Sequence, residues 1–124
     1  MTCNSVYETA LALLGEAGDA PGLADYRSRA PHLLGIIIAR LAGASALIDG
    51  RTVTAAAKPA LTDPFPLAER LMPAAAGMLA SMLILDELPE LAAILAEQAE
   101  RDRLAAGSEL PVPDIGSVRE VYGA

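Results

Sequence analysis

The sequence LMPAAAGMLASMLIL, residues 71–85, runs for 15 residues without a charged side chain. Small residues fill its first half and large aliphatic residues fill its second half. This pattern predicts a central helix that another helix approaches closely at its start and packs against broadly at its end. Because Pro73 has no N–H for the carbonyl of Glu69, we expect it to kink this helix one turn in. We interpret Met78 and Met82 as core-filling side chains, with a soft binding groove as the alternative.

On both sides of this stretch, apolar residues recur at the 3.6-residue period of amphipathic helices. Ser5 and Glu8 form a capping box that opens the first helix, and glycines after its apolar face offer stops. Glu97 and Arg101 form a favourable i, i+4 ion pair on the last helix, and Gly107 is the residue expected just past its end. The predicted helices span residues 5–17, 23–48, 67–85 and 88–106.

The second predicted helix contains Pro31, which allows either a short helix over 23–28 followed by a longer one, or a single kinked helix. Beyond the proline, the run LLGIIIARL at 33–41 is apolar on nearly all sides. This run predicts a helix covered by neighbours. Small residues along it would let another backbone approach closely: Gly35, Ala39, Ala42, Gly43 and Ala46.

Composition favours helix throughout the chain. Alanine and leucine supply 26 and 19 of the 124 residues, against five valines and seven isoleucines, and aromatic residues make up only 3%. Because strands draw on β-branched and aromatic residues, this bias argues against a mainly β fold. We predict an all-α protein: a small bundle of about four to five helices with a long loop after the second helix and an extended C-terminal tail. Residues 1–107 would form the helical domain and 108–124 the tail.

Two segments outside the predicted helices are candidates for contacts with a partner. The loop over 49–63 is long for a compact domain, and such connections tend to be functional. The tail begins with Pro111 and Pro113, which favour an extended start, and its later apolar spacing would let it dock on a groove or a sheet edge. The candidate assembly contacts are Arg51, Thr52, Val53 and Lys58 in the loop and Ile115, Val118, Val121 and Tyr122 in the tail.

The charge balance argues against specific nucleic-acid binding. Nine basic and 16 acidic residues give a net charge of −7, whereas a nucleic-acid binder needs basic groups to neutralise phosphates. Most of this charge lies in residues 86–124, which hold nine carboxylates and three arginines, a balance of −6. The C-terminal third is therefore expected to form the charged face of the molecule.

Neither apolar run is long enough to predict a membrane span. The runs 33–48 and 71–85 fall short of the ~20 residues that a bilayer requires, so we expect no membrane partner. A small two-span membrane protein such as a holin is the second alternative. Cys3 is the single cysteine and no leader-like segment opens the chain, which favours a reducing cytosol. We interpret Cys3 as a bystander near a frayed terminus.

The sequence contains no catalytic signature. His32 is its one histidine, which leaves no histidine cluster for a metal. Motifs of phosphate cradles and of hydrolase nucleophile elbows are absent. The acidic residues Asp86, Glu87 and Glu90 are interpreted as the N-terminal charge of a helix. We therefore predict a protein that is not an enzyme and needs no cofactor or metal.

The order of features over residues 65–90 is more specific than composition. FPL at 65–67 is followed by Arg70, Pro73 and small residues, then by MLILDE at 82–87 and PE at 89–90. This order resembles small prophage proteins of the head–tail connector (adaptor) class. The opening VYETALALLGE at 6–16, the segment 26–31 and the closing VYG at 121–123 are similar to the same group.

The resemblance implies an all-α structural subunit that forms a homo-oligomeric ring below the portal of a phage head, where genomic DNA passes. Its partners would be the portal and tail-side phage proteins. It would reside in the host cytoplasm during assembly and then in the virion. The chain departs from the class in having fewer aromatic residues, which makes the subunit contacts harder to assign.

A different hypothesis is a cytosolic helical module, unrelated to virions, that binds a protein or an apolar ligand. Its binding site would be a groove between the second and third helices, lined by Met78, Met82 and the isoleucines of the second helix. A groove open to solvent would support this hypothesis, and a filled core would reject it.

Overall fold

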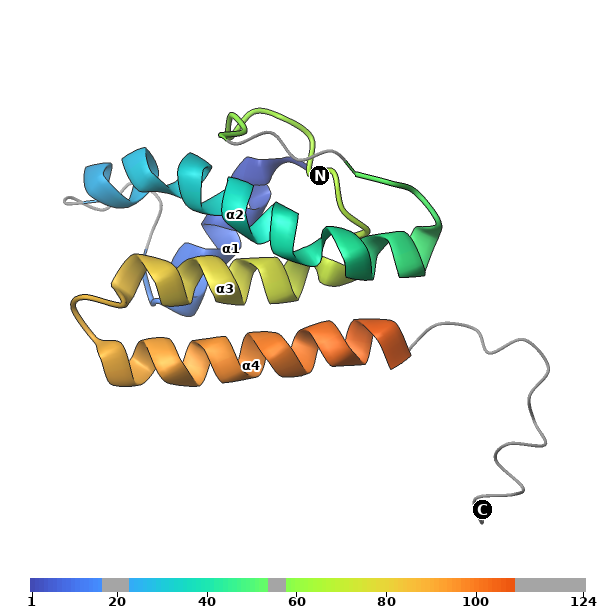
Figure 1. Ribbon diagram of the computed structural model, residues 1–124. Helices are drawn as coiled ribbons and strands as arrows, with labels where there is room; N and C mark the ends of the chain where they lie inside the picture. The colour runs from blue at the N-terminus through green and yellow to red at the C-terminus, as the bar shows by residue number, and fades with distance from the viewer. Residues whose placement is uncertain (17–22, 54–57, 109–124) are drawn as a thin grey trace, which may run out of the picture.

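The fold is a small all-α bundle, as the sequence predicts. The structure, a computed structural model, describes residues 1–16, 23–53 and 58–108. In these ranges there is no β-strand, and an isolated bridge joins Thr2 to Pro64. The helices, with one 3-10 turn, are α1 (Cys3–Leu13), α2 (Ala24–Asp49), η1 (Glu69–Leu71), α3 (Met72–Ile84) and α4 (Pro89–Ser108) (Figure 1).

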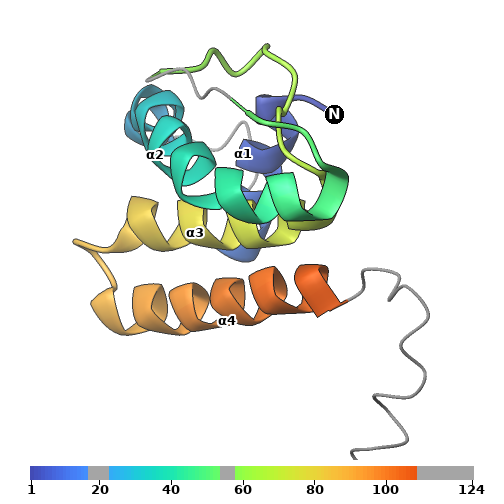
Figure 2. The same cartoon turned by 45° about the vertical axis from the view of Figure 1, so that its right-hand side comes forward.

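The uncharged helix α3 lies at the centre and contacts the other three α-helices. α1 and α2 lie on one side of α3, and α4 runs antiparallel to α3 on the other side (Figures 1 and 2). The charge-free stretch therefore forms a helix that is covered by other helices on two sides, which explains why its sequence has no polar face.

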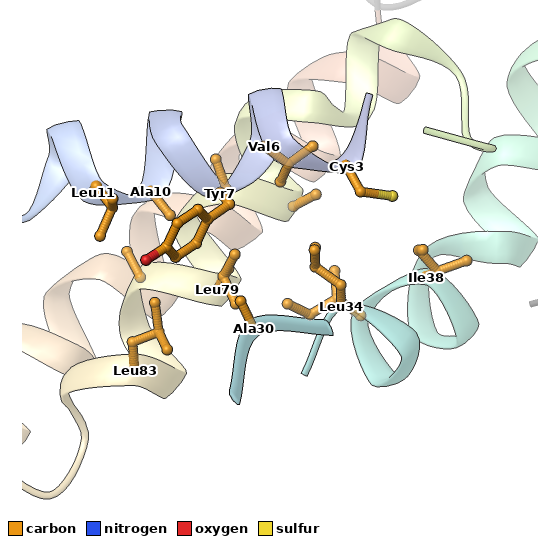
Figure 3. Packing of buried hydrophobic residues seen from close by; sticks show 14 of the residues in the cluster. Cys3, Val6, Tyr7, Ala10, Leu11, Ala30, Leu34, Ile38, Leu79 and Leu83 are labelled. Atoms are coloured by element: carbon orange, nitrogen blue, oxygen red, sulfur yellow. The ribbon is translucent and has the colours of Figure 1, made fainter. Parts of the chain in front are cut away.

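The core sits where α1, α2 and α3 meet. Large side chains from all three helices interdigitate there, as Figure 3 shows for Tyr7, Leu34 and Leu79. Fully burying one such side chain contributes roughly 1.5–3 kcal/mol to stability. The largest fully buried side chains include Tyr7, Leu11, Leu34, Ile37, Ile38, Leu41, Leu71, Leu79 and Leu83.

The methionines of α3 belong to this core. Met78 and Met82 are half-buried and pack against the buried cluster, which confirms the core-filling interpretation. Between α2 and α3, the side chains of Ile37, Ile38 and Leu79 are at most 1% exposed. The open groove that the ligand-binding alternative requires at this place is therefore filled.

The small-residue half of α3 permits close contact with α4. A Cβ placed on Gly77 would lie 3.0 Å from the Cβ of Ala99, a separation at which no additional methyl group fits without movement. The Ser81 hydroxyl also donates a 2.7 Å hydrogen bond to the backbone carbonyl of Ala92 across the same interface. The close approach predicted for the start of this helix is confirmed, and α4 is the helix that makes it.

The two prolines of the predicted helices, Pro73 and Pro31, both lie within α-helices. Pro73 sits in the first turn of α3, after η1, where a helix has no internal acceptor for its N–H groups. The predicted kink at Pro73 is therefore wrong. Pro31 lies inside α2, which continues through it as one 26-residue helix, so the two-helix alternative is also wrong.

The start of α1 corrects two further expectations. The helix begins at Cys3 with Thr2 as its N-cap, and the Thr2 hydroxyl accepts a 3.3 Å bond from the Ser5 N–H. The predicted Ser5 capping box is therefore wrong, because the helix starts earlier. Cys3 is 0% exposed and is part of the core, not a frayed end. At the other end of α1, Leu13 is 48% exposed, although large aliphatic side chains are usually buried.

α2 and α4 also differ from the predictions, α2 in how much of its surface is buried and α4 in the residue at which it ends. α2 buries one face only, since Ala39, Arg40 and Gly43 are exposed, and the expectation of cover on nearly all sides is wrong. α4 continues through Gly107 to Ser108, so Gly107 does not end it. The predicted Glu97–Arg101 ion pair is confirmed at 2.8 Å.

Candidate assembly surfaces

The predicted loop contacts lie in different environments. Arg51 follows the left-handed Gly50 that ends α2, and its guanidinium forms a 2.9 Å ion pair with Asp49. The hydrogen bond from the Arg51 N–H, together with this ion pair, lowers the pKa of the Asp49 carboxyl. Thr52 and Lys58 are exposed, whereas Val53 is half-buried and packs against the core. The loop thus offers Arg51, Thr52 and Lys58 to solvent more than Val53.

The rest of this loop fastens the N-terminus of α1. The backbone N–H groups of Cys3 and Asn4 donate to the carbonyls of Asp63 (2.9 Å) and Leu61 (2.8 Å). The Phe65 N–H donates in return to the Met1 carbonyl at 3.0 Å. The first N–H groups of a helix have no acceptor within the helix, and the carbonyls of Asp63 and Leu61 supply these acceptors for α1. Residues 61–65 therefore act as a structural strap, which the sequence interpretation of the loop as a partner site did not foresee.

The tail contacts predicted at Ile115, Val118, Val121 and Tyr122 lie outside the described residues. Of the predicted tail segment 108–124, the structure describes Ser108, which belongs to α4. The predicted contacts that the structure places are therefore those of the loop.

One exposed apolar area lies at the turn between α3 and α4, and we name it the turn-end surface. Leu85 and Leu88 are 55% and 53% exposed there, although large aliphatic side chains are usually buried. A hollow of about 360 Å³, lined in part by Leu88, opens at this turn. The turn-end surface comprises Leu85, Glu87, Leu88, Pro89, Glu90 and Leu91.

Polar contacts hold the turn-end surface against the start of α2. The Tyr26 hydroxyl donates a 3.0 Å hydrogen bond to Glu87 Oε2. Arg29 donates to the backbone carbonyl of Leu83 at 3.0 Å and also pairs with Asp25. Burial, followed by the bond to Glu87, raises the pKa of the Tyr26 hydroxyl. The α3–α4 turn is therefore held in a defined position, as a docking surface needs to be.

A second area lies at the opposite end of the α3–α4 hairpin, where α2 ends, α3 begins and α4 ends (Figure 1); we name it the tail-end surface. It contains three hollows of about 430, 340 and 210 Å³. The first and second share Glu69 and Arg70, and the first and third share Ile48. Arg51 lines the first hollow, so one predicted loop contact belongs to this surface.

The third hollow is the most apolar part of the tail-end surface, and we name it the α2–α4 groove. Leu47 on its rim is 81% exposed and Leu104 is 56% exposed. Neither residue was singled out from the sequence, and neither is in phase with the buried face of its helix: α2 buries Leu34, Ile38, Leu41 and Ser45, and α4 buries Ala92, Ala99 and Ala106. The groove is lined by Ala44, Leu47, Ile48, Arg103, Leu104 and Gly107.

The titratable groups of the described residues do not converge. Within residues 1–16, 23–53 and 58–108, no group of three or more His, Cys, Asp or Glu side chains is placed to hold a metal ion. Burial, with a smaller contribution from Asp63, raises the pKa of the Cys3 thiol, which disfavours the reactive thiolate. His32 is exposed on α2.

α2 also meets a simple criterion for a membrane span. Among the described helices it is the one that is long and apolar enough, with a mean hydropathy of 1.6 over its most apolar 18 residues. One third of that window is buried inside the bundle, and core helices pass the same test. The second span of the two-span alternative would fall on α3, whose 13 residues are fewer than the ~20 that a bilayer requires.

Comparison of the chain with protein-family models, with curated proteins and with solved structures finds no match.

Proposed function

We propose that this protein is a structural subunit of a phage or prophage head–tail connector, which forms a homo-oligomeric ring below the portal. The observation that carries the proposal is the placement of exposed apolar side chains at both ends of the α3–α4 hairpin. Leu85 and Leu88 lie at one end, and Leu47 and Leu104 at the other. A connector needs two such surfaces, because it joins the portal on one side to tail-side proteins on the other.

The residues that carry the family resemblance support the proposal through their structural roles. Phe65 and Leu67 are buried at the start of the hairpin, and Pro73 occupies the first turn of α3. The small residues that follow allow α4 to approach at Gly77. The most specific part of the resemblance, residues 65–90, therefore covers the entry to the hairpin, α3 and the start of α4.

The charge of α4 is consistent with a position beside DNA that must slide. Glu90, Glu97 and Glu100 are exposed on this helix. A channel lined with carboxylates lacks the basic groups that would hold phosphates. The proposal therefore includes no specific nucleic-acid binding, no enzymatic activity and no cofactor. It places the protein in the host cytoplasm during assembly and then in the virion.

Co-expression with the neighbouring portal gene, followed by electron microscopy, tests the proposal. We expect a ring of this protein on the portal. Leu85→Asp with Leu88→Asp should abolish the ring, because charged side chains would then occupy the turn-end surface. Ile94→Asp is the matched control, since Ile94 is 63% exposed on α4 and lines none of the hollows described above. A portal without a ring when the unaltered chain is present would contradict the proposal.

A further inference from the structure

The α2–α4 groove presents apolar surface that no described residue covers. Leu47, at 81%, has the highest exposure among the large exposed hydrophobic residues of the described chain. Around Gly43, one turn before it, and Gly107, on the groove wall, there is open space: a methyl group added to either glycine would meet no atom within 4 Å. Leaving large aliphatic side chains beside an open hollow in water is unfavourable by the hydrophobic effect. The groove therefore has the properties of a binding site for an apolar segment.

The chain itself continues from the edge of this groove. Gly107 lines the groove, α4 ends at Ser108, and 16 further residues follow, 109–124. Ile115, Val118 and Tyr122 occur in this segment at i, i+3 and i+7, the spacing by which a docked helix places three side chains on one face. The segment thus carries apolar side chains at the spacing that a docked helix would use to occupy the uncovered groove.

The length of the connection permits docking onto the same molecule. The eight residues from Gly107 to Ile115 span up to about 26 Å when extended, and they begin at the groove wall. A connection of this length gives an effective concentration on the order of millimolar. A second copy at micromolar concentration competes poorly with a segment that is already attached.

We propose that the apolar residues of 109–124 dock in the α2–α4 groove of their own chain, with Ile115, Val118 and Tyr122 as anchors. Docking covers Leu47 and Leu104 and closes part of the tail-end surface. The isolated protein then hides one of its two apolar ends from other copies. This inference depends on the groove and the adjoining segment and holds whether or not the protein belongs to a virion.

The full-length chain provides a clean test because it contains no tryptophan. Tyr122→Trp places a single fluorophore at one anchor. We expect its emission to be blue-shifted and protected from acrylamide, as for a buried indole. Adding Leu47→Asp to the groove should remove both effects, whereas adding Ile94→Asp should leave them unchanged. Circular dichroism of each variant verifies that the helices are retained.

Each remaining outcome decides against the proposal. An emission typical of solvent-exposed tryptophan in the Tyr122→Trp chain overturns docking altogether. A blue shift that survives Leu47→Asp places the segment somewhere other than the groove. A blue shift that disappears on dilution, together with a dimer in light scattering, assigns the groove to the segment of a second copy and overturns docking within one chain.

Discussion

The two sides of α3 are covered in different ways. Toward α1 and α2, large side chains such as Tyr7, Leu34 and Leu83 fill the space between helices. Toward α4, the side chains that α4 buries most completely are alanines, Ala92, Ala99 and Ala106. The first side is held by the burial of apolar surface, and the second is held by close approach of two backbones. The same helix therefore tolerates different substitutions on its two sides.

The largest expected effect is the loss of a large side chain on the first side. Leu34→Ala removes a side chain that is 0% exposed and leaves a cavity among α1, α2 and α3. We expect the free energy of unfolding to fall by about 3 kcal/mol, measured by urea denaturation followed by circular dichroism. Ile94→Ala, at a position on α4 that is 63% exposed and lines none of the hollows, is the control and should change it far less. Equal losses in the two variants would refute the assignment of the core.

The second side should be sensitive to added volume instead of lost volume. Gly77→Val places a branched side chain against Ala99, whose Cβ is already 3.0 Å from the position of a Gly77 Cβ. We expect a destabilisation of about 1–3 kcal/mol from overpacking. Ala99→Gly should relieve part of this cost, so that the double variant is more stable than the sum of the single effects predicts.

Gly43→Val is the matched control for this prediction. Gly43 is a helical glycine of α2 with nothing within 4 Å of a Cβ at that position, so a side chain there meets open space. Thermal unfolding of the two valine variants gives the comparison. Because valine has a higher helix propensity than glycine, a cost at Gly43 as large as that at Gly77 would show that the close approach of α3 and α4 does not explain the effect.

A smaller effect is expected where the turn-end surface is fastened to α2. Tyr26→Phe removes the hydroxyl that donates to Glu87 at 3.0 Å, at a cost of about 1 kcal/mol. Because the pKa of Tyr26 is raised in the folded protein from its ordinary value of 10.0, the hydroxyl favours folding most at pH values below 10. Its contribution disappears as the pH rises through the folded-state pKa.

The pH dependence separates this hydrogen bond from general packing. The difference in unfolding free energy between the unaltered chain and Tyr26→Phe should therefore be constant near neutral pH and shrink above pH 10. Tyr7, whose pKa is raised by burial, is present in both proteins and cancels in the comparison. A difference that does not change with pH would show that the hydroxyl acts through packing alone.

The smallest effect is expected on the outer face of α4. Glu97→Gln removes the ion pair with Arg101, in which both side chains are 67% exposed. Exposed pairs of this kind contribute little because water and salt screen them. We expect a change close to experimental error at physiological salt, with a slight loss at low salt. A loss as large as that of Tyr26→Phe would show that this face of α4 is covered in solution.

The parts of the fold that the sequence predicts are those set by local pattern. The uncharged run of α3, the core position of Met78 and the i, i+4 pair of Glu97 and Arg101 all follow from spacing along one helix. The misplaced features depend on residues far apart in sequence. Cys3 is buried because the strap at 61–65 lies over it, and no periodicity near Cys3 reports that.

The candidate surfaces were harder to predict than the fold because they also depend on contacts between residues that are far apart in sequence. Leu47 and Leu104 lie off the buried faces of their helices, and the fact that they line one groove depends on how α4 lies beside α2, which is far away in sequence. The contact between Tyr26 and Glu87 joins residues 61 positions apart. Of the predicted contacts that lie in the described residues, only Arg51, selected because it lies in a long loop, lines one of the hollows.

The strap has a consequence for the order in which the chain folds during synthesis. Cys3 and Pro64, which meet at the start of α1, are 61 residues apart. The first N–H groups of α1 therefore lack their backbone acceptors until residues 61–65 have left the ribosome. Contacts between residues so far apart in sequence also form later than the local contacts of a helix. α4 follows α3 directly and joins it through local contacts. We therefore expect the amides of Cys3 and Asn4 to become protected from hydrogen exchange only after residues 61–65 have emerged, later than the other amides of α1.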